Sequence, residues 1–312
     1  MKSGKKFKLL EGYGVVTIVM ILLFVVMSVI NKNFMTYTNM FNLARATAVS
    51  GILALAMTFV IITGGIDLSV GTHVGLAGMV VTQLTVNGIL PIGLAVIVAL
   101  IATAAIGLFN GVLIYDGKLP PFIATMGVMT ITRSIILIIS NSRNITGLPN
   151  SFLALAKITV LGIPFMAFVW IVVIIFSFIV FKYTTFGRNV FACGSNTEAA
   201  RLSGISVRWT TYGVFMLSGI LCGIGGILAT ARVASGVPTL GDGYEMDAIA
   251  ATVVGGASMS GGVGYVGGTV VGTILIATIT NAGTLLGFNT NVTRIIIGAL
   301  IIIAVLIDKF RK

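Results

Sequence analysis

Side chains that could catalyse a reaction or bind a metal are few in this chain of 312 residues, which has eight acidic residues, one histidine and two cysteines. His73 has no cysteine or carboxylate cluster around it, so we expect packing or a helix bond rather than metal or proton chemistry. Neither Gly4-Lys5 nor Gly117-Lys118 has the neighbours of a phosphate-binding loop. Cys193 and Cys222 fall in a predicted loop and a predicted span, which predicts free thiols. We therefore expect no catalytic residue, metal or cofactor in this chain.

One carboxylate has an unusual neighbourhood, because residues 62–71 place it among glycines between two apolar segments. An ionised Asp near hydrocarbon costs several kcal/mol unless it is capped, paired or hydrated, and glycines there permit a broken helix or close packing. We interpret Asp67 as the N-cap of the following helix, with a ligand contact as the alternative. The predicted break-and-cap motif comprises Gly64, Gly65, Asp67, Ser69 and Gly71.

The composition requires a membrane. Hydrophobic residues make up 57% of the chain and charged residues 9%, with a mean hydropathy of +1.12, values outside the range of soluble domains. A helix crosses the hydrocarbon layer in roughly 20 residues. The sequence therefore predicts an all-α polytopic membrane protein with one transmembrane domain, residues 1–312.

Ten apolar runs can be assigned to membrane helices. The run at 245–258 is short and begins with acidic residues, so a re-entrant segment is the alternative there. Glycine-rich turns at 62–71 and 255–264 interrupt apolar segments, as in transporters with broken helices, although glycines spaced as Gly219 and Gly223 also predict close helix packing. The runs are 13–30, 46–63, 70–86, 91–114, 121–140, 164–182, 209–230, 245–258, 264–285 and 291–307.

The net charge of +11 follows a topological pattern. Lysine and arginine are enriched on the cytoplasmic side of membrane proteins, so both termini and the long central loop are predicted to face the cytoplasm. An even number of spans agrees with this orientation. The basic residues concerned are Lys2, Lys5, Lys6, Lys8, Lys118, Lys182, Arg188, Arg201, Arg208, Lys309, Arg311 and Lys312.

That central loop, residues 183–207, is too polar to span a bilayer. Asn196 or Thr197 can cap a short helix, and Gly204 can end it in the left-handed conformation. The spacing of Glu198, Ala199, Ala200 and Gly204 resembles the coupling-helix motif of ATP-binding-cassette (ABC) importer permeases, in which this helix docks on a cytoplasmic ATPase. The resemblance assigns the coupling contact to Glu198, Ala199, Ala200, Arg201 and Gly204.

Further segments resemble the ribose-type monosaccharide ABC permeases over nearly the whole chain. They are Gly64-Gly65-Ile66-Asp67-Leu68-Ser69-Val70-Gly71, Lys118 to Thr125, Phe186-Gly187-Arg188, Tyr244 to Ala250 and Val254-Gly255-Gly256. The resemblance implies a ten-helix architecture like that of cobalamin-type (type II) importers, in the bacterial inner membrane. It also implies a second permease copy, a cytoplasmic ATPase that holds ATP and Mg, and an extracytoplasmic sugar-binding protein.

Two groups of polar residues are candidates for contact with a sugar or with the binding protein. Asn110, Thr125 and Asn281 lie inside predicted spans, where they could line a pathway or bond a neighbouring helix. The acidic residues Asp242, Glu245 and Asp247 are expected to face outward. Either they form an outer gate or dock, with Arg143, Lys157 or Arg232, or they are favourable charges at a helix N-terminus.

The first functional hypothesis is the membrane subunit of an ATP-driven sugar importer that works by alternating access and does no covalent chemistry. A secondary transporter driven by an ion gradient is the second, with Asp67 as its coupling carboxylate. A passive channel is the third. Related architectures leave a nucleoside or a branched-chain amino acid open as the substrate.

Overall fold

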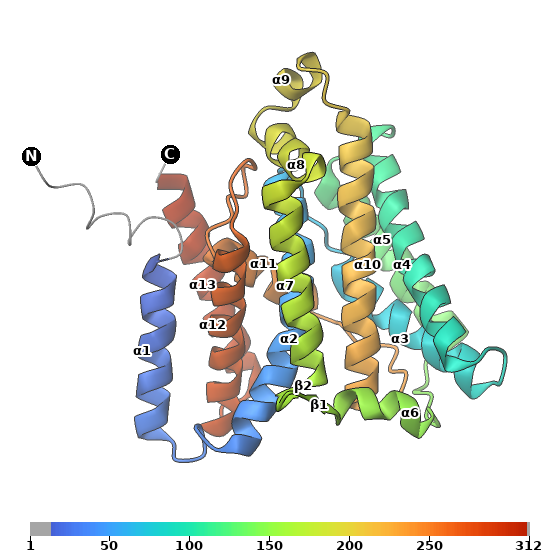
Figure 1. The fold of residues 1–312 in the computed structure, drawn as a ribbon, viewed down its shortest axis with the longest axis vertical. Helices are drawn as coiled ribbons and strands as arrows, with labels where there is room; N and C mark the ends of the chain where they lie inside the picture. The colour runs from blue at the N-terminus through green and yellow to red at the C-terminus, as the bar shows by residue number, and fades with distance from the viewer. Residues whose placement is uncertain (1–13, 311–312) are drawn as a thin grey trace, which may run out of the picture.

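A computed structural model describes residues 14–310, and helices dominate this part of the chain (Figure 1). Lys2, Lys5, Lys6, Lys8, Arg311 and Lys312, which entered the charge argument, lie outside the described residues. Within the described part, six helices are long and apolar enough to cross a membrane. They are α2 (Tyr37–Ile62), α4 (Ile92–Tyr115), α5 (Pro121–Ile139), α7 (Phe165–Tyr183), α10 (Val207–Val233) and α12 (Val266–Leu285).

Four further helices belong to the bundle. Three are α1 (Gly14–Ile30), α3 (Val70–Val86) and α13 (Thr290–Phe310). The fourth, α11 (Tyr244–Val254), has eleven residues and rises about 16 Å, roughly half of the hydrocarbon layer. The segment expected at 245–258 is therefore a half-length helix. An all-α polytopic membrane fold is confirmed, whereas the count of ten spans stays a prediction.

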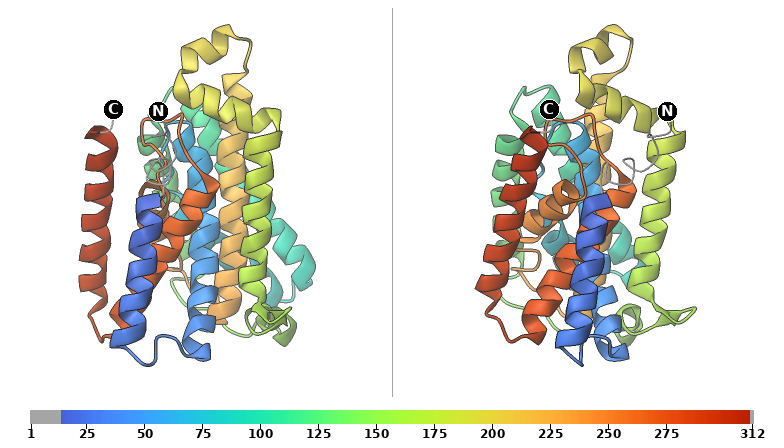
Figure 2. Two further views of the ribbon diagram at one scale, coloured as in Figure 1. Left: turned by 60° about the vertical axis from the view of Figure 1, so that its left-hand side comes forward. Right: turned by 90° about the vertical axis from the view of Figure 1, so that its left-hand side faces the viewer.

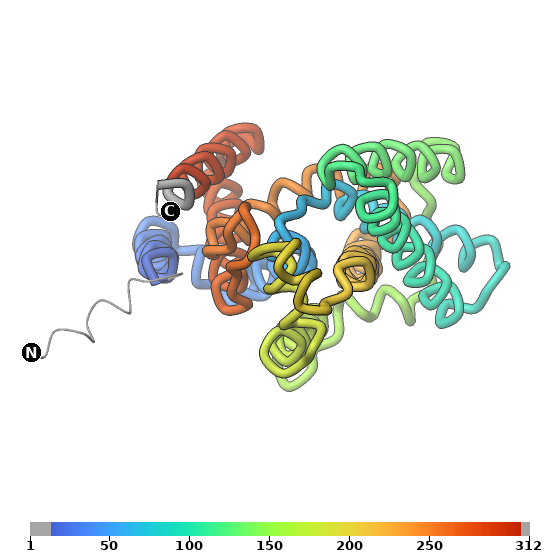
Figure 3. The backbone as a smooth tube through the Cα atoms, turned by 90° about the horizontal axis from the view of Figure 1, so that it is seen from above, coloured from blue at the N-terminus to red at the C-terminus, as the bar shows by residue number. Residues whose placement is uncertain are grey.

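The core of the bundle is built on α2 and α10. Their most apolar stretches are 83% and 78% buried, against 22% for α4, so the outer helices keep a broad apolar face for lipid. Helices α1 and α13 lie at one edge of the bundle, where α1 contacts α12 and α13 contacts α11 and α12 (Figures 2 and 3).

The two ends of the bundle carry different structures (Figure 1). Helices α8 (Thr185–Ser195) and α9 (Thr197–Leu202) lie at one end of the bundle, and the C-terminal end of α13 lies on the same side. The opposite end carries α6 (Asn150–Leu153), the short 3-10 helix η1 (Ala154–Ala156) and a hairpin of β1 (Thr159–Val160) and β2 (Ile163–Pro164), paired antiparallel.

The central loop contains more structure than the sequence predicted. Asn196 caps α9 by accepting the backbone N–H of Ala199 at 2.9 Å, and Gly204 follows with φ +81°, both as expected. Helix α8 was not predicted. Its signal is Thr184, whose side chain accepts the backbone N–H of Gly187 at 3.0 Å as an N-cap.

Close packing of α4 on α10 depends on glycine. The buried residues of α4 recur every three or four positions and form one stripe that faces α10. On α10, a Cβ added at Gly219 would overlap the carbonyl of Thr103, and one at Gly223 would overlap the hydroxyl of the same residue. The predicted role of Gly219 and Gly223 in helix packing is confirmed.

Replacing Gly219 should therefore destabilise the bundle. We expect Gly219→Ala to lower the free energy of unfolding by about 1–3 kcal/mol, because the new methyl group meets a backbone carbonyl that cannot rotate away. Thermal unfolding in detergent measures the change. Gly298→Ala is the matched control, since nothing lies within 4 Å of its added Cβ and alanine favours a helix. Equal melting temperatures for the two variants would contradict the packing argument.

Candidate functional site

The Asp67 carboxylate is fully buried at a break between α2 and α3. One of its oxygens accepts the backbone N–H of Ser69 at 2.9 Å and the Ser69 hydroxyl at 2.5 Å. Its other oxygen accepts the hydroxyl of Ser218 at 3.0 Å. Because Ser218 lies eleven residues into α10, about 16 Å along the helix, the carboxylate is held deep in the bundle.

Asn110 and Thr125, two of the predicted pathway residues, are bound to this break. The Asn110 amide donates to the Ser69 hydroxyl at 2.9 Å. The Thr125 hydroxyl oxygen accepts the backbone N–H of Leu68 at 3.1 Å and lies 3.2 Å from the Ile66 carbonyl. Both side chains are fully buried. Thr125 thus satisfies backbone groups of the break, whereas Asn110 bonds a side chain of the break. Neither residue lines the cavity between α2, α10, α11 and α12.

The structure differs from the sequence prediction on the role of Asp67. The N-cap position of α3 is Ser69, and no side chain caps the first turn there. Asp67 lies two residues before this position. Its carboxylate accepts the Ser69 N–H, which closes a turn, and accepts the Ser218 hydroxyl, which joins that turn to α10. His73 is bonded to its own helix, as expected, with Nδ1 donating to the Ser69 carbonyl at 2.7 Å.

A second interruption, residues 234–243, leads from α10 into α11 and lies in the gap between the predicted spans 209–230 and 245–258. The guanidinium of Arg133 on α5 donates to the carbonyls of Pro238 at 2.5 Å and Leu240 at 3.3 Å, and it pairs with Asp242. Sequence reasoning missed Arg133, although an arginine inside an apolar span was an available signal. The glycine-rich turn predicted at 255–264 is confirmed, because it lies in the connection between α11, which ends at Val254, and α12, which begins at Val266.

The two interruptions meet. A Cβ added at Gly71, in the first turn of α3, would overlap the carbonyl of Gly241 and lie 2.5 Å from a carboxylate oxygen of Glu245. One added at Gly75 would lie 2.7 Å from the Leu240 carbonyl. The start of α3 and the segment before α11 are therefore in backbone contact, which requires glycine on α3.

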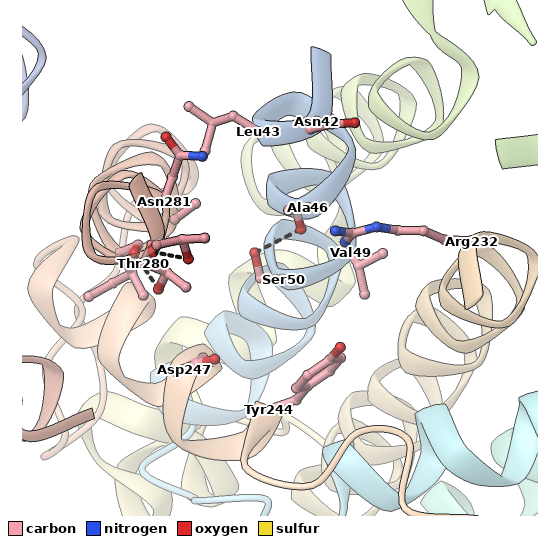
Figure 4. Close-up of a pocket in the computed structure, with 13 residues that line it drawn as sticks. Asn42, Leu43, Ala46, Val49, Ser50, Arg232, Tyr244, Asp247, Thr280 and Asn281 are labelled. Atoms are coloured by element: carbon pink, nitrogen blue, oxygen red, sulfur yellow. Dashed lines mark hydrogen bonds between the residues drawn. The ribbon is translucent and has the colours of Figure 1, made fainter. Parts of the chain in front are cut away.

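A cavity of about 370 Å³ lies between α2, α10, α11 and α12 (Figure 4). Asn42 lies near the start of α2 and Thr284 near the end of α12, so the cavity reaches the bundle end opposite α8 and α9. Its polar lining is Asn42, Ser50, Arg232, Tyr244, Asp247, Thr280, Asn281 and Thr284, and its apolar lining is Leu43, Ala46, Val49, Ile276 and Ala277.

Asn281 is the one predicted pathway residue that lines this cavity. Its amide donates to the Asn39 side-chain oxygen at 2.8 Å and accepts from the Asn39 amide at 3.1 Å. This reciprocal pair joins α12 to α2 beside the cavity. The hydroxyls of Thr280 and Thr284 donate to carbonyls of their own helix at 3.0 Å, which leaves oxygen lone pairs to accept from a ligand.

The three predicted acidic residues have three different surroundings. Asp242 pairs with Arg133, Glu245 lies against the first turn of α3, and Asp247 lines the cavity. Arg232 lines the same cavity, whereas Arg143 is exposed in the connection after α5 and is not among its lining residues. The structure therefore brings Asp247 and Arg232 together at one cavity and separates the other predicted dock residues from it.

Helix α9 presents charge and an exposed apolar side chain at its end of the bundle. Glu198 and Arg201 form an exposed two-contact ion pair at 2.6 and 3.1 Å, and the Arg201 hydrogen bond lowers the pKa of Glu198. Leu202 is 76% exposed. Ala200 is buried in a cluster with Cys193, whose thiol pKa is raised by burial. Both cysteines are free, as predicted.

Replacement of Asp67 tests whether its hydrogen bonds or its charge matter for folding. Asp67→Asn should keep most of the stability, because the amide oxygen can accept from Ser69 and the amide nitrogen can donate to Ser218. Asp67→Leu should lower the free energy of unfolding by about 1–3 kcal/mol or more, since the buried Ser69 N–H loses its acceptor. Melting temperatures in detergent measure both. A leucine variant as stable as the asparagine variant would show that the network does not hold the break.

A family model and the curated relatives of this chain all describe permease proteins of transport systems. A family model described as the permease component of branched-chain amino acid transport systems matches residues 39–305. The ribose import permease protein of Bacillus subtilis (strain 168) is 39% identical over 290 residues, which cover 92% of this chain and 90% of the relative. The galactose/methyl galactoside import permease protein of Escherichia coli (strain K12) is 34% identical over 327 residues, covering 99% and 97%.

The D-allose transport system permease protein of Escherichia coli (strain K12) is 33% identical over 299 residues, covering 96% of this chain and 92% of the relative. No solved structure matches the chain. The relatives match over most of the sequence, and the family match at 39–305 includes both helix breaks and the cavity lining. The chain therefore belongs to the ribose-type permeases of ABC importers.

Proposed function

We propose that this chain is the membrane subunit of an ATP-driven importer and carries a monosaccharide through the cavity between α2, α10, α11 and α12. The observation that carries the proposal is the lining of that cavity, which combines amides, hydroxyls, one carboxylate and one guanidinium with aliphatic side chains. A sugar presents hydroxyl groups that both donate and accept, and this set of groups matches them. The names of relatives as ribose, allose and galactose permeases support the same substrate class.

Delivery and energy supply come from partner proteins in this proposal. The end that carries α8 and α9 faces the cytoplasm, in accord with the basic residues Lys118, Arg188 and Arg201, so the cavity opens toward the extracytoplasmic binding protein. The cytoplasmic ATPase, which holds ATP and Mg, binds α9 through the Glu198–Arg201 pair and the exposed Leu202. A second permease copy completes the importer, each copy with the ten-helix type II architecture.

A secondary transporter is disfavoured by the surroundings of Asp67. A coupling carboxylate has to bind and release an ion from water, whereas Asp67 is fully buried and bonded to Ser69 and Ser218. It also lies outside the lining of the cavity. The Asp67 carboxylate thus has a structural task in the helix break rather than the ion-coupling role that the second hypothesis gives it.

Reconstitution tests the proposal directly. The chain is inserted into liposomes with its cognate ATPase, and labelled D-ribose, D-allose or D-galactose is offered with the cognate binding protein. We expect uptake of one of these sugars only when ATP is supplied on the ATPase side. Uptake by this chain alone, driven by a proton or sodium gradient, would overturn the proposal, as would ATP-driven uptake of a nucleoside or branched-chain amino acid but of no sugar.

Filling the cavity tests where the sugar passes. Ala46→Phe should reduce uptake at least tenfold, because the ring enters the space between α2 and α12. Amounts of folded permease should change little, since the added volume lies in a cavity rather than in packed core. Ala105→Phe, on the exposed face of α4, is the matched control and should leave uptake unchanged. Normal uptake by a folded Ala46→Phe permease would place the pathway elsewhere.

A further inference from the structure

Three separate segments of the chain meet at one point beneath α8. They are Ile62 with Gly64 at the end of α2, Gly194 near the end of α8, and Gly261 with Gly262 in the connection between α11 and α12. We call these five residues the glycine junction. The backbone N–H of Gly262 donates to the Ile62 carbonyl at 2.8 Å, which fixes two of the three segments to each other.

The third segment is held by steric contact. A Cβ added at Gly194 would overlap the Ile62 carbonyl and lie 2.7 Å from the Gly262 nitrogen. One added at Gly261 would lie 2.7 Å from the Gly194 carbonyl and 3.0 Å from the Gly64 nitrogen. Every one of these neighbours is a backbone atom. A backbone contact cannot relax by a change of rotamer, so a displacement of α8 toward the other two segments has to move them.

The junction connects α8 to the walls of the cavity. Ile62 is the last residue of α2, and the connection that holds Gly261 and Gly262 leads from α11 into α12. These three helices are three of the four that line the cavity. The fourth, α10, begins directly after the short connection from α9. Each wall of the cavity therefore has a direct structural link to the α8–α9 segment.

We propose that Gly194 is a positioning residue for transport, through which movement of α8 is passed to α2 and to the α11–α12 connection. The inference rests on the proposed function, in which the ATPase binds α9. The residue need not touch the sugar or the ATPase. Its role is to let the α8 backbone approach Ile62 and Gly262 without an intervening side chain.

The test measures coupling rather than assembly alone. Wild type, Gly194→Ala and Gly127→Ala are each reconstituted with the ATPase and the loaded binding protein. Copurification, ATP hydrolysis and uptake of the sugar that the wild type accepts are then compared. Gly127 is the matched control, because nothing lies within 4 Å of its added Cβ. For Gly194→Ala we expect copurification within twofold of wild type and continued hydrolysis, with sugar uptake per ATP hydrolysed reduced at least tenfold.

Other outcomes overturn the inference. Uptake per ATP within twofold of wild type would show that the contact passes on no movement, even if the amount of complex fell. Should Gly194→Ala fail to assemble, hydrogen–deuterium exchange on the wild-type complex decides: residues 60–66 and 258–264 should change exchange together when nucleotide is trapped on the ATPase, and no change would refute the proposal. Absence of ATP-driven uptake by the wild type would instead overturn the proposed function, and the junction with it.

Discussion

Backbone N–H and C=O groups inside a bilayer need partners within the protein, and this constraint governs the structure at its two helix breaks. At the first break, the Thr125 hydroxyl serves the backbone of Ile66 and Leu68, and the Asp67 carboxylate serves Ser69. At the second, Arg133 bonds the carbonyls of Pro238 and Leu240. Asp67, Thr125 and Arg133 thus hold irregular backbone in place, whereas buried threonines such as Thr47, Thr82 and Thr273 bond carbonyls one helical turn back.

Helix α5 has a central place in this arrangement, although it is an outer helix with limited burial. Thr125 and Arg133 are eight residues apart on it, about 12 Å, so one rigid helix fixes both breaks at a set distance. The breaks in turn contact each other where Gly71 packs on Gly241. This arrangement positions the start of the half-length helix α11, and with it Tyr244 and Asp247 in the cavity wall. Packing at the helix breaks thus determines where two residues of the cavity lining lie.

Patterns local in the sequence predicted the features that depend on local physics. Apolar runs identified the long helices, and Asn196 and Gly204 correctly marked the ends of α9. The sequence could not show that Asn110 and Thr125 bond a break, because their partners lie 41 and 57 residues away. It correctly placed a glycine-rich turn at 255–264, but it could not show that the break before α11 is held by Arg133, 105 residues from Pro238. Long-range pairing of this kind is visible only in the fold.

Glycine has two different uses in this chain. Between α4 and α10, glycine lets two long helices pack closely over a whole stripe, and the contact holds them at a fixed separation. At the glycine junction, the contact joins the end of α2 to a turn and to the short helix α8 at one end of the bundle. Positive φ values at Gly64, Gly261 and Gly262 give those turns conformations that L side chains rarely adopt. A close backbone contact between a helix end, a short helix and a turn is suited to passing on movement, whereas a contact along the middles of two long helices is suited to resisting it.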